Sequence, residues 1–371
     1  MARCRLFTVL PVLLILTLAF PTLQADAAVQ SSDHAIGGVF FISYQYGESG
    51  DGEYAGFYLR RAYLTAEKTV LPYMDARITL DTNQDMDGDG RGDMEVRIKY
   101  AYAKFHFPDF GFFNKQSLEV GIVHAPWLDF EEHVNYYRMR ERMFIERAGV
   151  INSADFGITY ATFLGGELDD EYKKTVNGKY AGRYGSMAFG VYNGGGYHAV
   201  EENTNTVFEA RLTVRPLPDT MPGLQLSGFG VAGKGNGAGT TTNHIPDWNA
   251  LLGMLSYEHR YFTVTGQYLH GLGNQKGEWV EAANLTEAVD YEGHSFFAEL
   301  KPTTHWRVIG GFDSFDPDLD VNNDHYSVYY AGLGYDFGNH NLLLFDYDAK
   351  DYVSNARETE YWYQLTLQVK Y

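Results

Sequence analysis

Cysteine is almost absent from this chain of 371 residues, and its single cysteine, Cys4, lies in a segment with the pattern of a secretory signal. Arg3 and Arg5 form a basic start, an apolar stretch runs from Leu6 to Phe20, and Ala25-Asp26-Ala27 has the small residues of a cleavage site. An exported protein without disulfides must gain its stability elsewhere, and a closed sheet without free edges is one solution.

We therefore predict a cleaved secretory signal peptide at residues 1–27 and a single domain without thiols at residues 28–371. After the signal, no run of apolar residues approaches the roughly 18 that a transmembrane helix needs. Only β-strands could then carry the chain across a membrane, because every backbone polar group in lipid must be bonded internally.

Positive charge is scarce, since 29 Lys and Arg residues stand against 48 Asp and Glu residues, giving a net charge of -19. This balance argues against nucleic acid as a partner, although it says little about the local charge inside a pore. The chain also lacks a Gly-x-Ser-x-Gly elbow, a His-Glu-x-x-His motif and a phosphate-binding P-loop. His124, His133 and His270 lack metal-ligand spacing. We predict that the protein is not an enzyme.

Residues that favour strands and tight turns are abundant: the chain has 29 Tyr, 24 Phe and 40 Gly. Alternating side chains bounded by Gly, Pro, Asn and Asp indicate sixteen strands, an even number, as in single-chain bacterial barrels. Fourteen and eighteen strands are the alternatives. The sixteen segments lie near residues 36–45, 55–67, 73–82, 95–107, 117–125, 156–163, 184–192, 206–215, 224–232, 249–258, 261–270, 292–301, 305–314, 326–336, 340–349 and 360–371.

The connections alternate in length, which predicts an all-β fold: a transmembrane antiparallel β-barrel with short periplasmic turns and long external loops. One connection, residues 164–183, should be a turn but is about twenty residues long. Either it holds an excursion or the strand count is wrong there. The short links are 216–223, 259–260, 302–304 and 337–339, and the long loops are 193–205, 233–248, 271–291, 315–325 and 350–359.

The terminal segment, residues 361–371, alternates two classes of side chain without a slip and ends on an aromatic residue. Such an end resembles the last strand of Gram-negative outer-membrane barrels, which closes the barrel against the first strand. We expect its polar face, from Gln364 to Lys370, to line the lumen, and its apolar face, including Tyr371, to contact lipid.

The longest connection, residues 126–153, is also the most densely charged. It follows the fifth strand, which in porins precedes a third loop that folds inward and narrows the lumen. Opposed charges there would create a field across the pore that orients polar solutes and excludes apolar ones. A solvated surface helix with salt-bridging charges is the alternative. Under the first interpretation the constriction residues are Glu131, Glu132, Arg138, Arg140, Glu141, Arg142 and Arg147, with Asp129 and Glu146 nearby.

Basic residues also recur on one face of several strands with apolar residues opposite. A charge that faces lipid at mid-bilayer costs about 2 to 4 kcal/mol, so these faces must be lumenal or close to an interface. They predict either a cationic wall that favours anions or a mixed polar lining, since Asp75, Glu95 and Glu209 share them. The pore-wall residues are Arg60, Arg77, Arg97, Lys99, Arg211 and Arg215, and the residues expected on opposite, lipid-facing positions include Ile98, Tyr100, Tyr102, Phe208 and Leu212.

Arg60 and Arg61 are adjacent and cannot both face the lumen in a regular strand. Their adjacency predicts a β-bulge or a position near the membrane interface.

The segment from Asp85 to Asp93 resembles a calcium-binding loop. Four carboxylates match the spacing of calcium ligands: Asp85, Asp87, Asp89 and Asp93. Gly90 matches the sharp turn of such a loop, but Val96 stands where the final, bidentate acid would be. We expect either a Ca²⁺ site within residues 85–95 at an external hairpin tip or a plain acidic, glycine-rich tip.

Three further segments resemble the phosphate-selective porin O/P family. They are Phe57 to Leu64, Val120 to Trp127, and Phe144 to Arg147 followed by Ser153 to Gly157. The resemblance implies a sixteen-stranded and usually trimeric channel in the Gram-negative outer membrane. Phosphate preference in this family depends on ladders of Arg and Lys, a part that Arg60, Arg61 and the other wall residues could take here.

These observations predict an outer-membrane porin through which small hydrophilic solutes and ions diffuse passively, with a possible preference for anions such as phosphate. Its partners would be lipid, these solutes and two further copies of the chain in a homotrimer, without nucleic acid. The alternative is an outer-membrane barrel that acts through calcium-ordered loops as a binding or adhesion surface with little conductance.

Overall fold

A computed structural model describes residues 34–50, 52–85, 92–237, 245–354 and 357–371; the predicted signal peptide lies outside them. Sixteen antiparallel strands form one closed barrel in these residues, with two further short strands in an external loop. No helix in the described part of the chain is long and apolar enough to span a bilayer. The predicted fold class and the sixteen segments are confirmed.

Consecutive strands pair all around the barrel, and β1 pairs with β18 to close it. The barrel strands are β1 (His34–Ser49), β2 (Gly52–Leu71), β3 (Met74–Gln84), β4 (Met94–His106), β5 (Phe113–His124), β6 (Ala154–Leu164), β7 (Gly185–Tyr192), β8 (Val207–Val214), β9 (Leu224–Lys234), β10 (Asp247–His259), β11 (Phe262–Leu272), β14 (Asp290–Leu300), β15 (Trp306–Asp316), β16 (Tyr326–Gly338), β17 (Asn341–Tyr352) and β18 (Glu360–Lys370). The short pair is β12 (Val280–Glu281) and β13 (Asn284–Ala288).

The terminal segment closes the barrel as predicted. Tyr371 extends the pairing of β18 beyond its last residue, because its backbone N–H donates to the carbonyl of Gly38 and its carbonyl accepts from the N–H of Gly38, both at 3.0 Å. Gln364 and Thr366 point inward and are buried, whereas Leu365 between them is exposed on the outer face. The faces predicted for Gln364, Leu365 and Thr366 are therefore confirmed.

Two β-bulges shift which residues face the lumen. Arg61 pairs with Phe41 and Leu59 pairs with Ile42, so Arg60 is an extra residue in β2 and both arginines can turn inward. This is the bulge that the adjacent arginines predicted.

A second bulge corrects the expected faces of β4. Thr79 pairs with Tyr100 and Leu80 with Ile98, which leaves Lys99 as the extra residue. Tyr100 and Tyr102 were expected to face lipid, but beyond the bulge both lie on the inner face and are buried.

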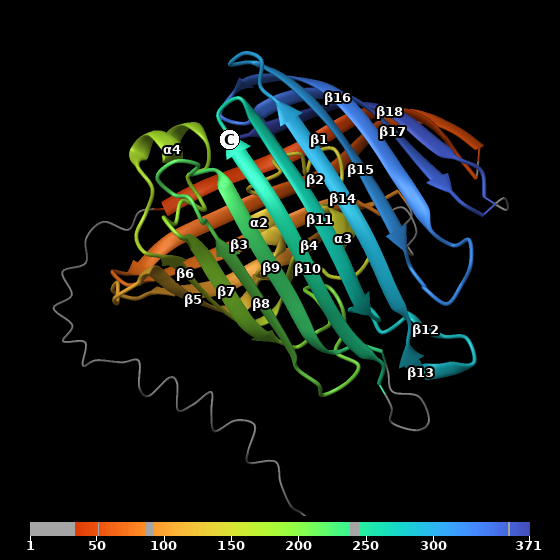
Figure 1. Cartoon of the computed structure of the whole chain (residues 1–371), viewed down its shortest axis with the longest axis horizontal. Helices are drawn as coiled ribbons and strands as arrows, with labels where there is room; N and C mark the ends of the chain where they lie inside the picture. Colours follow the sequence, from red (N-terminus) through yellow and green to blue (C-terminus); the bar gives the residue numbers. More distant parts are fainter. Residues whose placement is uncertain (1–33, 51, 86–91, 238–244, 355–356) are drawn as a thin grey trace, which may run out of the picture. The chain divides into compact units, whose positions relative to one another are not determined.

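The inward loop, residues 125–153, runs inside the barrel and carries α2 (Leu128–Glu131) and α3 (Phe144–Arg147) (Figure 1). Its apolar side chains, among them Trp127 and Ile145, pack with inward residues of β8 to β15 into one buried cluster that includes Phe229, Trp248 and Leu252. The interior of the barrel is therefore not polar throughout, because apolar side chains fill this half of it. Fully buried side chains there exclude water and hold the loop against one wall.

The overlong connection does hold an excursion. The β6–β7 connection, residues 165–184, carries α4 (Asp170–Thr175), which lies at the end of the barrel where the chain terminates (Figure 1). Asp169 caps this helix by accepting a hydrogen bond from the backbone N–H of Tyr172. Because β18 also ends there, we assign this end to the periplasm and the β12–β13 end to the outside.

Candidate permeation site

Ion pairs fasten the inward loop to the acidic wall formed by β15 and β17. The guanidinium of Arg140 contacts the buried carboxylate of Asp348, and that of Arg147 contacts Asp313. Tyr137 adds a hydrogen bond of 2.7 Å to Glu299 of β14. Two of the predicted constriction residues, Arg140 and Arg147, therefore have their charges bound to the wall behind the loop.

Glu131 faces the same buried side of the loop. Its carboxylate accepts hydrogen bonds from the indole N–H of Trp127 and from the amide of Gln267, each at 2.7 Å. Burial raises the pKa of Glu131 to about 7, because the charged form loses its hydration and no cation lies against it among the described residues. Glu131 holds the loop in place and does not border either of the cavities described next.

Other charges of the loop face the opposite wall, formed by β1 to β4. Glu141 accepts a hydrogen bond of 2.9 Å from Arg60. Burial works to raise the pKa of Glu141, but the charges of Arg60 and Arg142 together with the backbone N–H of Arg142 outweigh it and hold this pKa below its usual value. Arg138 lies between Glu132, at 3.3 Å, and Glu146, at 3.6 Å.

Two cavities lie along this wall, one toward each end of the barrel. The outer cavity has a volume of about 690 Å³ and is bordered by Arg60, Arg61, Arg138 and Arg142. The inner cavity, of about 730 Å³, is bordered by Arg77, Lys99, Arg138 and Lys179. Phe41 and Arg138 border both cavities, so they mark the level at which the two meet.

Several basic side chains of this wall rest on aromatic rings. The ammonium of Lys99 lies 4.7 Å from the ring centre of Tyr63, and the guanidinium of Arg77 lies 5.1 Å from that of Tyr100. The bulge in β4 makes this possible, because it turns Tyr100 inward beside Lys99.

Asp81 is an acid of this wall that our sequence reasoning missed. It is fully buried on β3 and binds Arg61 at 3.1 Å and Arg97 at 3.7 Å. Tyr197, from the loop between β7 and β8, crosses to it and donates a hydrogen bond of 3.0 Å. Alternation in 73–82 did put Asp81 on the same face as Arg77, but nothing in the sequence paired it with side chains from three other segments.

Two predicted pore-wall residues, Arg211 and Arg215, face inward but lie behind other parts of the chain. The guanidinium of Arg211 bonds the carbonyl of Pro126 at 3.0 Å and lies over the ring of Phe130. Arg215 bonds the carbonyls of Tyr180 and Gly182 in the β6–β7 connection. Both side chains are almost fully buried, so they support the inward loop and the connection and do not form an open cationic surface.

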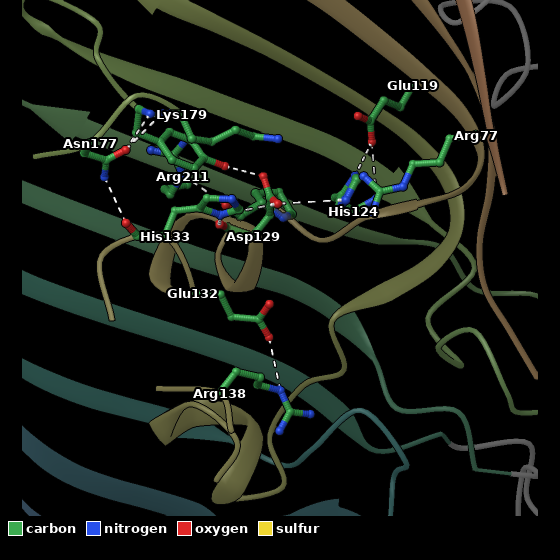
Figure 2. A network of polar contacts seen from close by, with 12 residues as sticks. Arg77, Glu119, His124, Asp129, Glu132, His133, Arg138, Asn177, Lys179 and Arg211 are labelled. Atoms are coloured by element: carbon green, nitrogen blue, oxygen red, sulfur yellow. Dashed lines mark hydrogen bonds and ion pairs between the residues drawn. The ribbon is translucent and has the colours of Figure 1, made fainter. Parts of the chain in front are cut away.

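A polar network joins the inward loop to the β6–β7 connection on the periplasmic side (Figure 2). Its centre is Asp129, whose carboxylate accepts a hydrogen bond of 2.5 Å from Tyr180 and lies 3.9 Å from His124 and 3.7 Å from His133. His124 in turn bonds Glu119 at 2.8 Å. The sequence assigned no role to these histidines, because the network joins residues 119–133 to Tyr180, which lies in a distant part of the chain.

The predicted calcium loop is only partly visible, since Asp87 and Asp89 lie outside the described residues. Asp85 and Asp93 close the hairpin: the N–H of Asp85 donates to the carbonyl of Asp93 at 2.8 Å. In other external loops, Glu281, Asp318 and Asp320 have ligand atoms within 4.8 Å of one another. Exposed acidic groups of this kind are common without a bound ion.

Comparison with known proteins identifies the family. The family model of phosphate-selective porins O and P matches residues 37–235, which is more than half of the chain. The chain belongs to the phosphate-selective porin O and P family. A search among curated proteins returned no match. As a member of this family with a porin fold, the protein is a channel of the Gram-negative outer membrane.

Solved porins share the fold at low sequence identity. An anion-selective porin from Comamonas acidovorans superposes with a TM-score of 0.64 at 10% identity, covering 92% of this porin and 100% of that chain. The outer membrane channel DcaP of Acinetobacter baumannii gives 0.60 at 11%, covering 94% and 100%. OmpF of Salmonella typhi, in a complex with daunomycin, gives 0.59 at 11%, covering 91% and 97%. These likenesses establish the barrel architecture alone.

Proposed function

We propose that small hydrophilic solutes diffuse passively between the inward loop and the inner wall of β1 to β4, with a preference for anions. The route follows the outer and inner cavities and passes Phe41 and Arg138, which border both. Among the residues that the structure describes, the apolar cluster of the inward loop fills the opposite half of the lumen, which supports a route along β1 to β4.

The charge of the cavity lining carries the proposed anion preference. Four basic side chains border the outer cavity against two acidic ones, Glu53 and Glu141. Five basic side chains border the inner cavity against three acidic ones, Glu67, Asp129 and Glu132. Both linings are therefore net positive in a chain whose overall charge is -19. Fixed positive charge along a narrow aqueous route raises the local concentration of anions and lowers that of cations.

Planar-bilayer recording of the purified protein tests both parts of the proposal. We expect ohmic conductance, and under a potassium chloride gradient a reversal potential of the sign that anion preference gives. Arg138→Gln and Arg142→Gln should each reduce that potential, since both side chains border the outer cavity. Lys276→Gln is the control, because Lys276 is exposed in an external loop and borders neither cavity. Absence of conductance would refute the channel, and unchanged potentials in the first two variants would refute the route.

Trimer formation and calcium binding are further proposals. The family resemblance supports a homotrimer, which heat-modifiable migration of the unheated protein on a gel would reveal. The carboxylates within residues 85–95 support a Ca²⁺ site, because oxygen ligands at this spacing suit that ion. Calorimetric titration with Ca²⁺ should give a signal that Asp85→Asn together with Asp93→Asn removes, and equal heats in both proteins would refute the site.

A further inference from the structure

The β6–β7 connection does not stay at the rim of the barrel. Residues 167 and 182 form an antiparallel bridge at its base, and the N–H of Leu168 donates to the carbonyl of Ala181 at 2.8 Å. The segment between them reaches the lumen, because Gly178 and Lys179 border the inner cavity together with residues of the inward loop. A periplasmic connection thus meets the inward loop inside the barrel (Figure 2).

Asn177 fixes the tip of this connection. Its side chain is buried, and its amide donates to the carbonyl of His133 in the inward loop and to the carboxylate of Glu258 on β10, each at 2.9 Å. Its amide oxygen accepts from the backbone N–H groups of Lys179, at 3.1 Å, and Tyr180, at 3.0 Å. One side chain therefore joins the connection, the loop and the barrel wall and sets the turn that presents Lys179.

Tyr180 supplies a second attachment. Its hydroxyl donates to Asp129 at 2.5 Å, and its ring meets the ring of Phe130 edge to face, with centres 5.0 Å apart. The guanidinium of Arg211 lies 5.2 Å from the centre of the same ring. Asn177 and Tyr180 together hold the residues on either side of Lys179 against parts of the protein that do not move with the connection.

Lys179 itself is exposed to the lumen. It borders the inner cavity and also a third cavity, of about 370 Å³, between the connection and β4 to β8. Within the described residues no carboxylate lies within 4.0 Å of its ammonium, unlike that of its neighbour Lys173, which pairs with Asp170 at 2.8 Å. The charge of Lys179 nevertheless acts on Asp129. Burial works to raise the pKa of Asp129, but nearby positive charges, of which Lys179 is the foremost, hold this pKa low.

We propose that the β6–β7 connection forms a second narrowing of the pore on the periplasmic side, in which Lys179 is a specificity-determining residue and Asn177 and Tyr180 are positioning residues. This inference rests on the proposed passage of solutes along the β1–β4 wall. Anions that pass Arg138 would then meet the Lys179 ammonium before they leave the barrel. The side chains that select for anions then come from two places: Arg138 from the inward loop and Lys179 from the β6–β7 connection.

Cysteine substitution tests the exposure of Lys179, because the chain has no cysteine after Cys4. Lys179→Cys is treated during bilayer recording with a negatively charged and, separately, a positively charged methanethiosulfonate. Lys174→Cys is the control: Lys174 is also exposed, lies on α4 and borders none of the three cavities. The negative reagent should lower the anion-to-cation permeability ratio about two- to fivefold at position 179, as expected for a charge reversal close to the ion path. The positive reagent should restore the ratio while it lowers conductance, and neither should act on Lys174→Cys.

Two outcomes overturn the inference while the proposed function stands. One is a conducting Lys179→Cys protein that mass spectrometry shows to be labelled but whose conductance and selectivity do not change. The other is an equal response of the Lys174→Cys protein. If the unmodified protein does not conduct, the proposed function itself fails, which is a separate observation.

The positioning role is tested with Tyr180→Phe, which keeps the ring and removes the hydrogen bond to Asp129. We expect noisier single-channel current and a changed rate of reagent attack at Lys179→Cys in this background. Heat-modifiable migration should stay as in the parent protein, because the barrel strands are untouched. A purely structural role would change migration or nothing at all, and either result would overturn the assignment of Tyr180.

Discussion

The attachment of the inward loop to the acidic wall can be tested with Arg140→Met. In the native protein the guanidinium of Arg140 bonds the carboxylate of Asp348 and lies 3.6 Å from the ring centre of Tyr330. Methionine fills a similar volume but leaves Asp348, which is fully buried, without its cation. Removal of one partner of a buried ion pair costs about 3 to 5 kcal/mol.

The substitution destabilises the state in which the loop lies against the wall relative to the state in which the loop is displaced, because water can hydrate Asp348 once the loop moves away. At about 1.4 kcal/mol per factor of ten, the population of displaced loops should rise by roughly 10² to 4 × 10³. The pair Arg147–Asp313 and the apolar cluster remain, so the loop should still be inside most of the time.

Single-channel recording measures this population directly. We expect Arg140→Met to show brief openings to a larger conductance that are rare in the native channel. Arg142→Met is the matched control, because Arg142 is exposed and its loss leaves no buried acid unpaired. Combining Arg140→Met with Asp348→Leu should suppress the openings, since replacing both partners of a buried pair by apolar groups is close to neutral. A native current trace for Arg140→Met would refute the reasoning.

Three further outcomes are expected. Asp81→Asn should release Arg61 and Arg97 and so increase anion preference in reversal-potential measurements; an unchanged or lower preference contradicts the role of Asp81. Deletion of Tyr371 should reduce the amount of protein assembled in the membrane while the conductance of assembled channels stays native, because its backbone pairs with Gly38 at the barrel seam. The raised pKa of Glu131 means that the folded state binds a proton more tightly than the unfolded chain, so stability should fall by about 1 kcal/mol between pH 6 and pH 8. Thermal melts of Glu131→Gln should lack that part of the pH dependence.

The strands could be predicted because a barrel wall imposes a local rule. Each residue of β18 faces either lipid or lumen, so the alternation from Tyr361 to Tyr371 is visible without knowledge of any other segment. The adjacent arginines at 60 and 61 broke that rule and thereby revealed the bulge in β2. The bulge at Lys99 left no such sign, because Tyr100 and Tyr102 fit a lipid-facing position as well as an inward one.

The interior of the barrel could not be predicted in the same way, because its contacts join distant segments. Trp248 and Leu252 of β10 face inward, whereas Leu251 and Leu255 face outward. Because all four side chains are apolar, the sequence of β10 does not reveal which face is which. Their burial makes sense only when the inward loop is placed against them. The excess length of the β6–β7 connection did indicate an excursion from the barrel. It did not indicate that Asn177 would bond His133 or that Tyr180 would bond Asp129.

The charge of the pore follows from the position of the inward loop more than from composition. Asp313, Asp346 and Asp348 lie buried on the inner face of β15 and β17, where Arg140 pairs with Asp348 and Arg147 pairs with Asp313. A displaced loop would expose these three acids to the solute path and carry the two arginines away. The larger openings of Arg140→Met should therefore prefer cations, opposite to the main conductance level. Reversal potentials resolved for each level would test this, and the same preference at both levels would mean that the acidic wall never meets the permeating ions.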